Sequence, residues 1–362
     1  MPSEMTANYP RYDAERLKWF TRAVFERVGV KPGDAAVAAE ILVASDLRGI
    51  ESHGMPRLRA YLDRIAAGAI NLEATPTIDR ETAVTAAVDG QNGLGLSVAH
   101  WAMDLCVRKA LASGLAFVTV RGSNHFGIAG YYATMALERG LVGVAATNAA
   151  PLMVPPHARR PLLGTNPVAM AVPAGKERPF VLDIALTTVA WGKVEIARRE
   201  EHPIPLGWAL DEAAQPTTDP FAARYLQPLG GMRETGGHKG YGLATFFDVL
   251  CGPLGGAGFS LAIPRAFSAA TQSNTGHFFA AWQPEAFRPR EEFEAEMDAM
   301  LRALRSAEPA EGFERVYVAG DYEFAAEEDR RANGIPLHPQ VVAELEKIAG
   351  ETDVPFDALV AG

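Results

Sequence analysis

The stretch "DLRGIESHGMPRLRAYLDR" (residues 46–64) breaks a helical pattern and places a histidine in the gap. Apolar residues recur at helical spacing before the gap, over residues 37–47, and again after it, over residues 58–65. Asp34 is expected to cap the first of these helices. The sequence therefore predicts two helices joined by Ser52-His53-Gly54.

The side chains at this gap are suited to a small organic acid. Arg57 offers a planar guanidinium that matches a carboxylate, and the first-turn N–H groups of a helix starting near Met55 favour an anion. His53 beside them can transfer a proton near neutral pH. Two interpretations stay open: a site for a 2-hydroxy or 2-keto acid, or a capped helix corner with an exposed histidine.

Three later positions add polar groups in loops that α/β proteins use for ligands. "VTVRGSNHFGIAGYYATMAL" (118–137) runs from a predicted strand through His125 into a helix. "GGHKGYGLATFFDVLCG" (236–252) directs free N–H groups and Lys239 at one point, which is typical of a phosphate site. Asp183 ends a predicted strand and can hydrogen-bond a sugar hydroxyl or orient a histidine. Helix capping and ordinary glycine turns are the alternatives.

The middle of the chain predicts a sheet, and both ends predict helices. Short β-branched or Ala/Val-rich runs that end at Gly, Pro or Asn indicate buried strands; they cover residues 82–90, 115–123, 141–151, 166–174 and 179–186. A helix is predicted over residues 96–114, ending at Gly114. We expect an α/β (α+β) fold with a central mixed-sheet lobe of residues 76–284. A helical lobe is expected from residues 1–75 together with residues 285–362.

Composition excludes several classes of function. The net charge of −10 argues against a nucleic-acid surface, which needs a basic stripe. No apolar run is long enough to span a bilayer, and the start of the chain lacks the apolar core of a signal peptide. Two cysteines give no disulfide framework, so a cytoplasmic location is expected.

Other motifs are weak or absent. The eight histidines show no paired spacing typical of a metal site, so no metal is expected. "GLGLSV" (93–98) lacks the third glycine of the Rossmann fingerprint. The aromatic pairs Tyr131-Tyr132 and Phe246-Phe247 are predicted to lie in the core.

Six segments in register resemble the malate/L-lactate dehydrogenase family of the second type. They cover residues 12–340 and read "DLRGIESHGMPRLRAY", "SNHFGIAGYYA", "LGTNPVAMAVP", "LDIALTTVAWGKV", "GWALDEAAQPTTDP" and "GGHKGYGLATFFDVLCGPLGGAG". That family also includes ureidoglycolate, sulfolactate and diketogulonate oxidoreductases and a reductase of a cyclic imino acid. The resemblance implies a homodimeric oxidoreductase that uses NAD, with NADP as the alternative, in a fold that is not Rossmann. It also implies that residues 76–284 bind the cofactor.

The resemblance assigns roles to residues of this chain. The family's catalytic histidine and its carboxylate-binding arginine match His53 and Arg57, with Ser52 beside them. Some members use the histidine that matches His125 as the acid/base. The residues that match cofactor contacts are Asp183, Ile184, Ala185, Lys239, Gly240 and Gly320.

The chain departs from the family pattern in three places. It reads "PPHARRPLLG" (155–164) where many members have a Trp-Gly-Gly turn, and Ala319-Gly320-Asp321 where Pro-Gly-Glu is usual. Leu186 replaces a small polar residue. These changes bear on the cofactor contacts near residues 149–160 and 319–323.

The sequence thus predicts hydride transfer between a nicotinamide and a 2-hydroxy or 2-keto acid. Arg57 would bind the carboxylate, His53 or His125 would move the hydroxyl proton, and Ser52 or Asp183 would orient the imidazole. Two alternatives remain: reduction of a cyclic imino acid, and a nucleotide-binding homologue without turnover.

Overall fold

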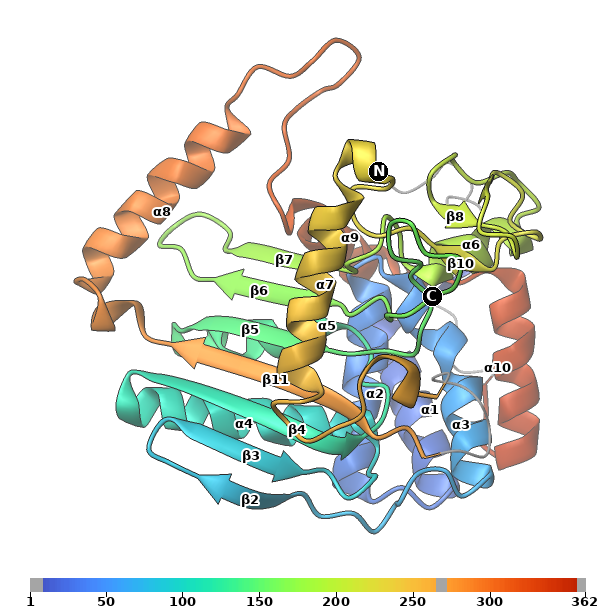
Figure 1. The fold of residues 1–362 in the computed structure, drawn as a ribbon. Coiled ribbons are helices and arrows are strands. Elements are labelled where there is room, and N and C mark those ends of the chain that lie inside the picture. Colours follow the sequence, from blue (N-terminus) through green and yellow to red (C-terminus); the bar gives the residue numbers. More distant parts are fainter. Residues whose placement is uncertain (1–8, 265–271, 357–362) are drawn as a thin grey trace.

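A seven-stranded mixed sheet forms the centre of the computed structural model, which describes residues 9–264 and 272–356 (Figure 1). The strand order is β2-β3-β4-β11-β5-β6-β7. The strands are β2 (Thr77–Glu81), β3 (Thr85–Asp89), β4 (Leu115–Ser123), β5 (Val142–Thr147), β6 (Val168–Val172), β7 (Phe180–Ile184) and β11 (Thr275–Trp282). Within this sheet β3 and β4 are parallel and the other neighbours are antiparallel. The predicted mixed α/β fold with a central mixed sheet is confirmed.

The five predicted strand regions correspond to β3 to β7, and two strands of this seven-stranded sheet were missed. Strand β2 is exposed along its whole length, so it carries no alternation of apolar and polar residues. Strand β11 lies in the centre of the sheet, between β4 and β5. It follows β5 by more than a hundred residues, so its place in the sheet could not be read from chain order.

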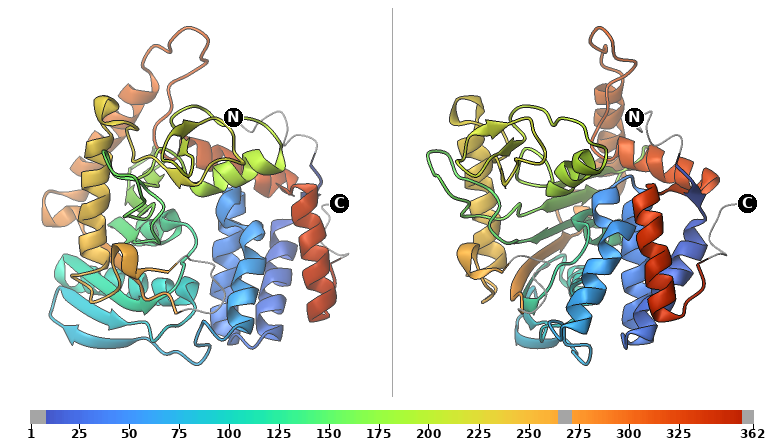
Figure 2. Two further views of the ribbon diagram at one scale, coloured as in Figure 1. Left: turned by 45° about the vertical axis from the view of Figure 1, so that its right-hand side comes forward. Right: turned by 90° about the vertical axis from the view of Figure 1, so that its right-hand side faces the viewer.

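Helices cover both faces of the sheet. Helices α4 (Gly95–Ser113) and α5 (Ala129–Met135) pack on one face, and α7 (Gly237–Cys251) packs on the other, against β11, β5 and β4. Figure 2 shows this layering, with α7 on the opposite side of the strands from α4 and α5. Helix α4 ends at Gly114, which has a positive φ of 86°, as predicted.

The helices of the two chain ends lie together beside the sheet (Figure 1). They are α1 (Ala14–Arg27), α2 (Pro32–Leu47), α3 (Leu58–Ala66), α9 (Asp321–Asn333) and α10 (Pro339–Thr352). The ends are also joined by an antiparallel pairing of β1 (Arg11–Tyr12) with β12 (Ile335–Pro336). Helix α2 begins at Pro32 with Lys31 as its N-cap, so the predicted cap at Asp34 was wrong; Asp34 lies in the first turn.

Helix α8 (Arg290–Arg305) lies apart from the other terminal helices (Figure 1). Its Asp298 accepts hydrogen bonds from the backbone N–H groups of Gly175, Lys176 and Glu177, in the turn between β6 and β7. These contacts hold α8 against the edge of the sheet rather than against α1 or α2.

A smaller unit lies next to the terminal helices. Helix α6 (Trp191–Arg199) packs with a three-stranded antiparallel sheet of order β10-β8-β9 and has its own apolar cluster. The strands are β8 (Ala209–Leu210), β9 (Pro216–Thr217) and β10 (Tyr225–Leu226).

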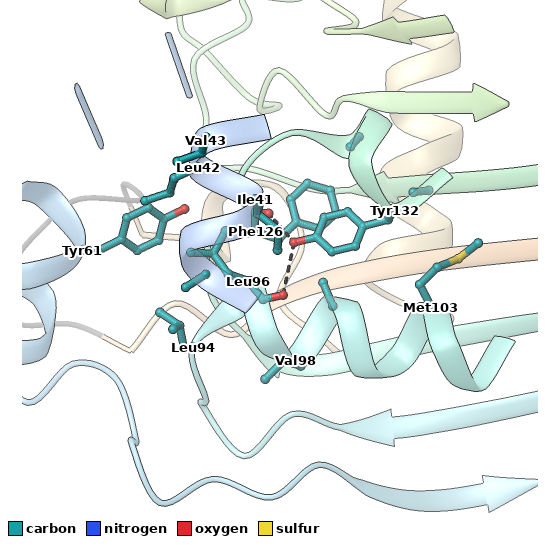
Figure 3. Packing of buried hydrophobic residues seen from close by; sticks show 14 of the residues in the cluster. Ile41, Leu42, Val43, Tyr61, Leu94, Leu96, Val98, Met103, Phe126 and Tyr132 are labelled. Atoms are coloured by element: carbon teal, nitrogen blue, oxygen red, sulfur yellow. Dashed lines mark hydrogen bonds between the residues drawn. The ribbon is translucent and has the colours of Figure 1, made fainter. Parts of the chain in front are cut away.

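The main core joins α2, α4 and the loop after β4 (Figure 3). Phe126 is buried and stacks on Tyr132, with 4.8 Å between the ring centroids. The Tyr132 hydroxyl donates to the carbonyl oxygens of Phe126 and Leu96. The backbone next to His125 is therefore anchored in the core.

Of the two aromatic pairs predicted to lie in the core, Tyr132 and Phe247 are buried. Tyr131 is half-buried, and the prediction was wrong for Phe246, whose exposed fraction is 55%. In the part of the chain that the structure describes, none of the helices combines the length and apolar character needed to cross a membrane.

Candidate active site

The gap between α2 and α3 consists of two short 3-10 turns, Glu51–His53 and Met55–Arg57. Helix α3 starts at Leu58, three residues later than the predicted start near Met55. Gly54 separates the turns, and a Cβ atom there would lie 2.2 Å from the Asp46 carboxyl group. Glycine is therefore required next to His53 for steric reasons.

Hydrogen bonds fix the side chains of these turns. The Ser52 hydroxyl lies 2.8 Å from Nδ1 of His53. Arg57 donates from Nε to the Ser52 carbonyl oxygen at 2.7 Å. Ser52 thus contacts both His53 and Arg57, so hydrogen bonds connect the three predicted residues.

His125 lies opposite, in the loop between β4 and α5. Its Nδ1 accepts from the backbone N–H of Gly127 at 3.3 Å and lies 2.6 Å from the Tyr61 hydroxyl. A neutral ring that accepts at Nδ1 carries its proton on Nε2. The rings of His53 and His125 are stacked, with 5.6 Å between centroids and 15° between planes.

These residues border one cavity of about 690 Å³, within the size range of cofactor and substrate pockets. The predicted residues among its lining are Ser52, His53, Arg57, His125, Asp183 and Ala185. They come from the α2–α3 gap, the loop after β4 and the end of β7. The rest of the lining comes mainly from residues 149–152, helix α6 and Glu323 of α9.

Arg57 has a carboxylate partner from another element. Its Nη2 donates to Oε2 of Glu195, on α6, at 2.7 Å. The Arg57 side chain is 16% exposed and that of Glu195 is 36% exposed. Both residues border the cavity, so a carboxylate already lies where the sequence predicts the substrate's carboxylate to bind.

Burial shifts the ionisation of the site. It lowers the pKa of His53 to about 4, and the nearby Arg57 charge acts in the same direction. The pKa of His125 is lowered well below its ordinary value by burial and by His53 and Arg57. Both imidazoles are therefore neutral at pH 7, which the sequence did not indicate.

Asp183, which also borders the cavity, contacts the first turn of α5. Its Oδ2 accepts from the Gly130 N–H at 2.7 Å, and a Cβ at position 130 would lie 2.6 Å from that oxygen. Burial raises the pKa of Asp183 to about 6, although the bond from Gly130 acts against this.

Four of the predicted cofactor residues do not border this cavity. Lys239 is exposed on α7, and Gly240 packs so closely that a Cβ there would lie 2.1 Å from the Leu229 carbonyl oxygen. Ile184 is partly buried at the end of β7, and Gly320, with φ 99°, caps α9. Their role in cofactor binding stays a prediction.

Sequence reasoning missed Glu195, Trp191, Glu323 and Tyr61 as site residues. Tyr61 was predicted only as part of an apolar helix face, although it contacts His125. Glu195 is 138 residues from Arg57 in sequence, and no motif pointed to this ion pair. Among the described residues, no group of three or more His, Cys, Asp or Glu side chains is arranged to hold a metal ion.

Comparison with known proteins identifies relatives over nearly the whole chain. Malate dehydrogenase of Pyrococcus horikoshii is 41% identical over 351 residues, which cover 96% of this chain and 97% of the relative. A solved structure of malate dehydrogenase from Pyrococcus horikoshii matches with a TM-score of 0.88 at 38% identity, over 96% of this chain and 97% of that one.

Two further relatives have other names. L-sulfolactate dehydrogenase of Methanocaldococcus jannaschii is 36% identical over 328 residues, covering 91% of this chain and 93% of its own. Ureidoglycolate dehydrogenase (NAD(+)) of Escherichia coli is 32% identical over 312 residues, covering 86% and 88%. The family model described as malate/L-lactate dehydrogenase matches residues 12–346, so this chain belongs to the malate/L-lactate dehydrogenase family.

Proposed function

We propose that this protein is an NAD(P)-dependent dehydrogenase that acts on the CH–OH group of a small 2-hydroxy acid, or reduces the matching 2-keto acid. The observation that carries the proposal is the meeting of His53, His125 and Arg57 at one cavity. The relatives named above act, by their names, on malate, sulfolactate and ureidoglycolate, which are all 2-hydroxy acids.

The residues around the cavity fit a nicotinamide cofactor. The volume of about 690 Å³ leaves room for a substrate beside part of a dinucleotide. Small side chains at Ala129, Ala149, Ala150 and Ala185 allow a flat ring to approach the backbone closely. We propose that Asp183 and Ala185 contact the cofactor, with Ile184, Lys239, Gly240 and Gly320 as further predicted contacts. When bound, a reduced nicotinamide supplies the hydride and its oxidised form accepts it.

Arg57 binds the substrate carboxylate in this mechanism. The bond from Nε to the Ser52 carbonyl oxygen fixes the plane of the guanidinium, so its orientation is set before the substrate arrives. Positioning of this kind reduces the entropy that must be lost in the transition state.

His53 transfers the proton of the substrate hydroxyl. Ser52 holds Nδ1, so Nε2 is the nitrogen that exchanges the proton. Because the imidazole is neutral at pH 7, it is ready to accept a proton when the hydroxy acid is oxidised. His125 stacks on the same ring and is the alternative acid/base.

An assay matrix tests the proposal. Oxidised NAD and NADP are each combined with malate, lactate, ureidoglycolate and sulfolactate, the reduced forms are each combined with a cyclic imine, and the absorbance of the reduced cofactor is followed. Turnover with at least one hydroxy acid supports the dehydrogenase. Turnover with the cyclic imine alone would instead establish the imine reductase, and cofactor binding without any turnover would establish an inactive homologue.

We also propose that the protein forms a homodimer through α7. This helix covers the sheet with one face, while Leu243, Phe246 and Val249 on its other face are 41%, 55% and 46% exposed. Leu254, Phe259 and Leu261 extend this exposed apolar surface into the following loop. Exposed apolar patches of this kind mark subunit interfaces. Light scattering of the wild type and of Phe246→Glu measures the expected change from dimer to monomer.

The chain is proposed to consist of a cofactor lobe and a helical lobe. We propose a cofactor fold that is not Rossmann, because the central sheet has one parallel pair among its described neighbours whereas a Rossmann sheet is mostly parallel. We propose residues 76–284 as the cofactor lobe, and residues 1–75 with 285–362 as the helical lobe on the substrate side, although α8 contacts the β6–β7 turn. The sequence also placed the dimer side on the helical lobe, whereas the exposed apolar face of α7 moves the proposed dimer contact to residues 76–284. Limited proteolysis tests these boundaries.

A cytoplasmic location is a further proposal. Both cysteines, Cys106 and Cys251, are buried as free thiols, which agrees with a reducing compartment. Cell fractionation with an antibody against the native chain tests this location.

A further inference from the structure

Asp46 lies directly behind the turn that carries His53. It belongs to the last turn of α2 and is fully buried. Its Oδ2 accepts from the backbone N–H of Met55 at 2.7 Å. Its Oδ1 is buried and has no hydrogen-bond partner among the described residues. The close approach of the Gly54 backbone to this carboxyl group leaves no space for any other residue at that position.

A second buried side chain holds the other end of the same turn. Arg330, from α9, is 5% exposed. Its Nη1 donates to the backbone carbonyl oxygen of Asp46 at 2.5 Å, and its Nη2 donates to the Glu51 carboxylate. The short segment Ser52–Gly54 therefore lies between Glu51, which is held by Arg330, and Met55, which is held by Asp46.

The surroundings of Asp46 favour its neutral form at pH 7. Burial raises its pKa to about 8, and the negative charge of Glu51 acts in the same direction. The Met55 N–H and the charge of Arg330 act in the opposite direction but do not overcome the effect of burial. A small cavity also borders Asp46, and its other polar or ionisable lining groups are Tyr9, Glu51, Arg199, Glu200 and His338.

We propose that Asp46 is a positioning residue whose buried carboxyl group accepts the Met55 N–H and holds the Gly54–Met55 backbone, so that His53 faces the substrate. Ser52 orients the imidazole ring, whereas Asp46 and Arg330 set the backbone from which that ring projects. This inference rests on the proposed role of His53 in proton transfer.

The neutral form has a chemical consequence for the site. An ionised carboxylate behind the turn would favour the protonated imidazole and would draw the Arg330 charge away from Glu51. A neutral carboxyl group accepts the Met55 N–H without adding charge. Above about pH 8 the carboxyl ionises, and the geometry of the turn is then expected to change.

Three variants test the inference. Asp46→Ala removes the acceptor of the Met55 N–H, and a displaced acid/base is expected to lower kcat about 10²-fold while the KM for the cofactor stays close to that of the wild type. Asp46→Asn is isosteric with the neutral acid and keeps the acceptor, so it is expected to restore kcat. The wild type is expected to lose kcat above about pH 8, and Asp46→Asn is expected not to show this decrease. Gly54→Ala leaves Asp46 intact but displaces the turn, and it is expected to behave like Asp46→Ala.

A control and a second measurement separate this inference from the proposed function. Asp298→Ala removes another buried carboxylate that accepts backbone N–H groups, but in the β6–β7 turn, so it is expected to lower stability without lowering kcat. Hydrogen–deuterium exchange of peptides that contain Met55 reports on the turn without any substrate. Exchange is expected to be faster in Asp46→Ala and unchanged in Asp46→Asn.

The outcomes are distinct. If Asp46→Ala keeps wild-type exchange at Met55 and wild-type kcat, the inference is overturned. If kcat of Asp46→Asn is as low as that of Asp46→Ala, Asp46 does not act as a neutral carboxyl group, because the ionised carboxylate would then be needed. If His53→Ala has normal turnover, the proposed role of His53 in proton transfer fails, and exchange at Met55 alone then decides whether Asp46 holds the turn.

Discussion

Arg57 and Glu195 form an ion pair of 2.7 Å across the candidate active site, between the α2–α3 gap and helix α6. The pair joins the residue predicted to bind the substrate carboxylate to a carboxylate of the protein itself. When the substrate binds, its carboxylate must therefore share Arg57 with the Glu195 carboxylate or displace it.

Replacing Glu195 with Gln is expected to lower the KM for the keto acid by several-fold. The variant removes an anion that competes for Arg57, and partly exposed ion pairs of this kind contribute roughly 0.2–1 kcal/mol, about a fivefold change at most. Steady-state kinetics at saturating cofactor measure this KM. Glu201→Gln, at the exposed end of the same helix region, is the control and should leave it unchanged. A rise in KM for Glu195→Gln would show that Glu195 orients Arg57 and does not compete.

Arg57→Lys keeps the positive charge but loses the planar fork. The ammonium cannot contact Ser52, Glu195 and a substrate carboxylate with the same geometry, so kcat/KM for the hydroxy acid is expected to decrease about 10²-fold. Arg59→Lys is the matched control, because Arg59 pairs with Glu344 and Glu351 of α10 instead. Equal kinetics for the two variants would argue against a carboxylate clamp at Arg57.

The rate of reaction is expected to depend on pH through His53. With a pKa of about 4, the imidazole is already unprotonated at pH 6, so kcat/KM for hydroxy-acid oxidation should stay constant from pH 8 down to about pH 5. Reduction of the keto acid needs the protonated ring, so its kcat/KM should rise as the pH falls through this range. Profiles of kcat/KM against pH, measured for oxidation and for reduction, test both expectations. A change in kcat/KM centred near pH 6.5 in both reaction directions would show that His53 is not buried as described.

Stability is expected to fall on acidification. His53, His125 and His277 have pKa values below the ordinary 6.5, mainly because they are buried. The unfolded chain therefore binds protons first, and the free energy of unfolding decreases as the pH is lowered from 6.5 towards 4. Urea unfolding at several pH values measures this slope. His53→Asn should reduce the slope, and an unchanged slope would mean that His53 contributes no proton uptake.

Asp46 is expected to act on stability in the opposite direction. Its pKa rises from 3.8 in the unfolded chain to about 8, so the folded protein retains a proton that the unfolded chain has lost. The free energy of unfolding then decreases as the pH rises from 3.8 to about 8. Asp46→Asn has no such proton, so its stability relative to the wild type should increase over this interval. A constant difference between the two proteins, measured by urea unfolding, would contradict a raised pKa.

Local sequence patterns predicted much of this structure because they report on nearby residues. The break at Ser52-His53-Gly54, the end of α4 at Gly114 and the strands β3 to β7 all follow from apolar spacing and turn residues. Strand β2 has no buried face. Strand β11 lies between β4 and β5, which both come much earlier in the chain. Local periodicity therefore encodes neither the existence of β2 nor the position of β11 in the sheet.

The site was predicted in its chemistry but not in its electrostatics. The residue types at His53 and Arg57 indicated a carboxylate site before any geometry was known. The pairing of Arg57 with Glu195, the contact of Tyr61 with His125 and the burial of Asp46 depend on tertiary packing. For the same reason, the sequence suggested a histidine that titrates near neutral pH, whereas burial lowers the pKa of His53 to about 4.

The most direct test of the account is to compare His53→Ala and His125→Ala in single-turnover reactions with the best hydroxy acid, with cofactor affinity measured by fluorescence. If His53 transfers the proton, its replacement is expected to slow the chemical step about 10²- to 10⁴-fold without changing cofactor affinity, and His125→Ala should have the smaller effect. Near-normal rates in both variants would contradict the central claim that the imidazole beside Arg57 moves the substrate's proton.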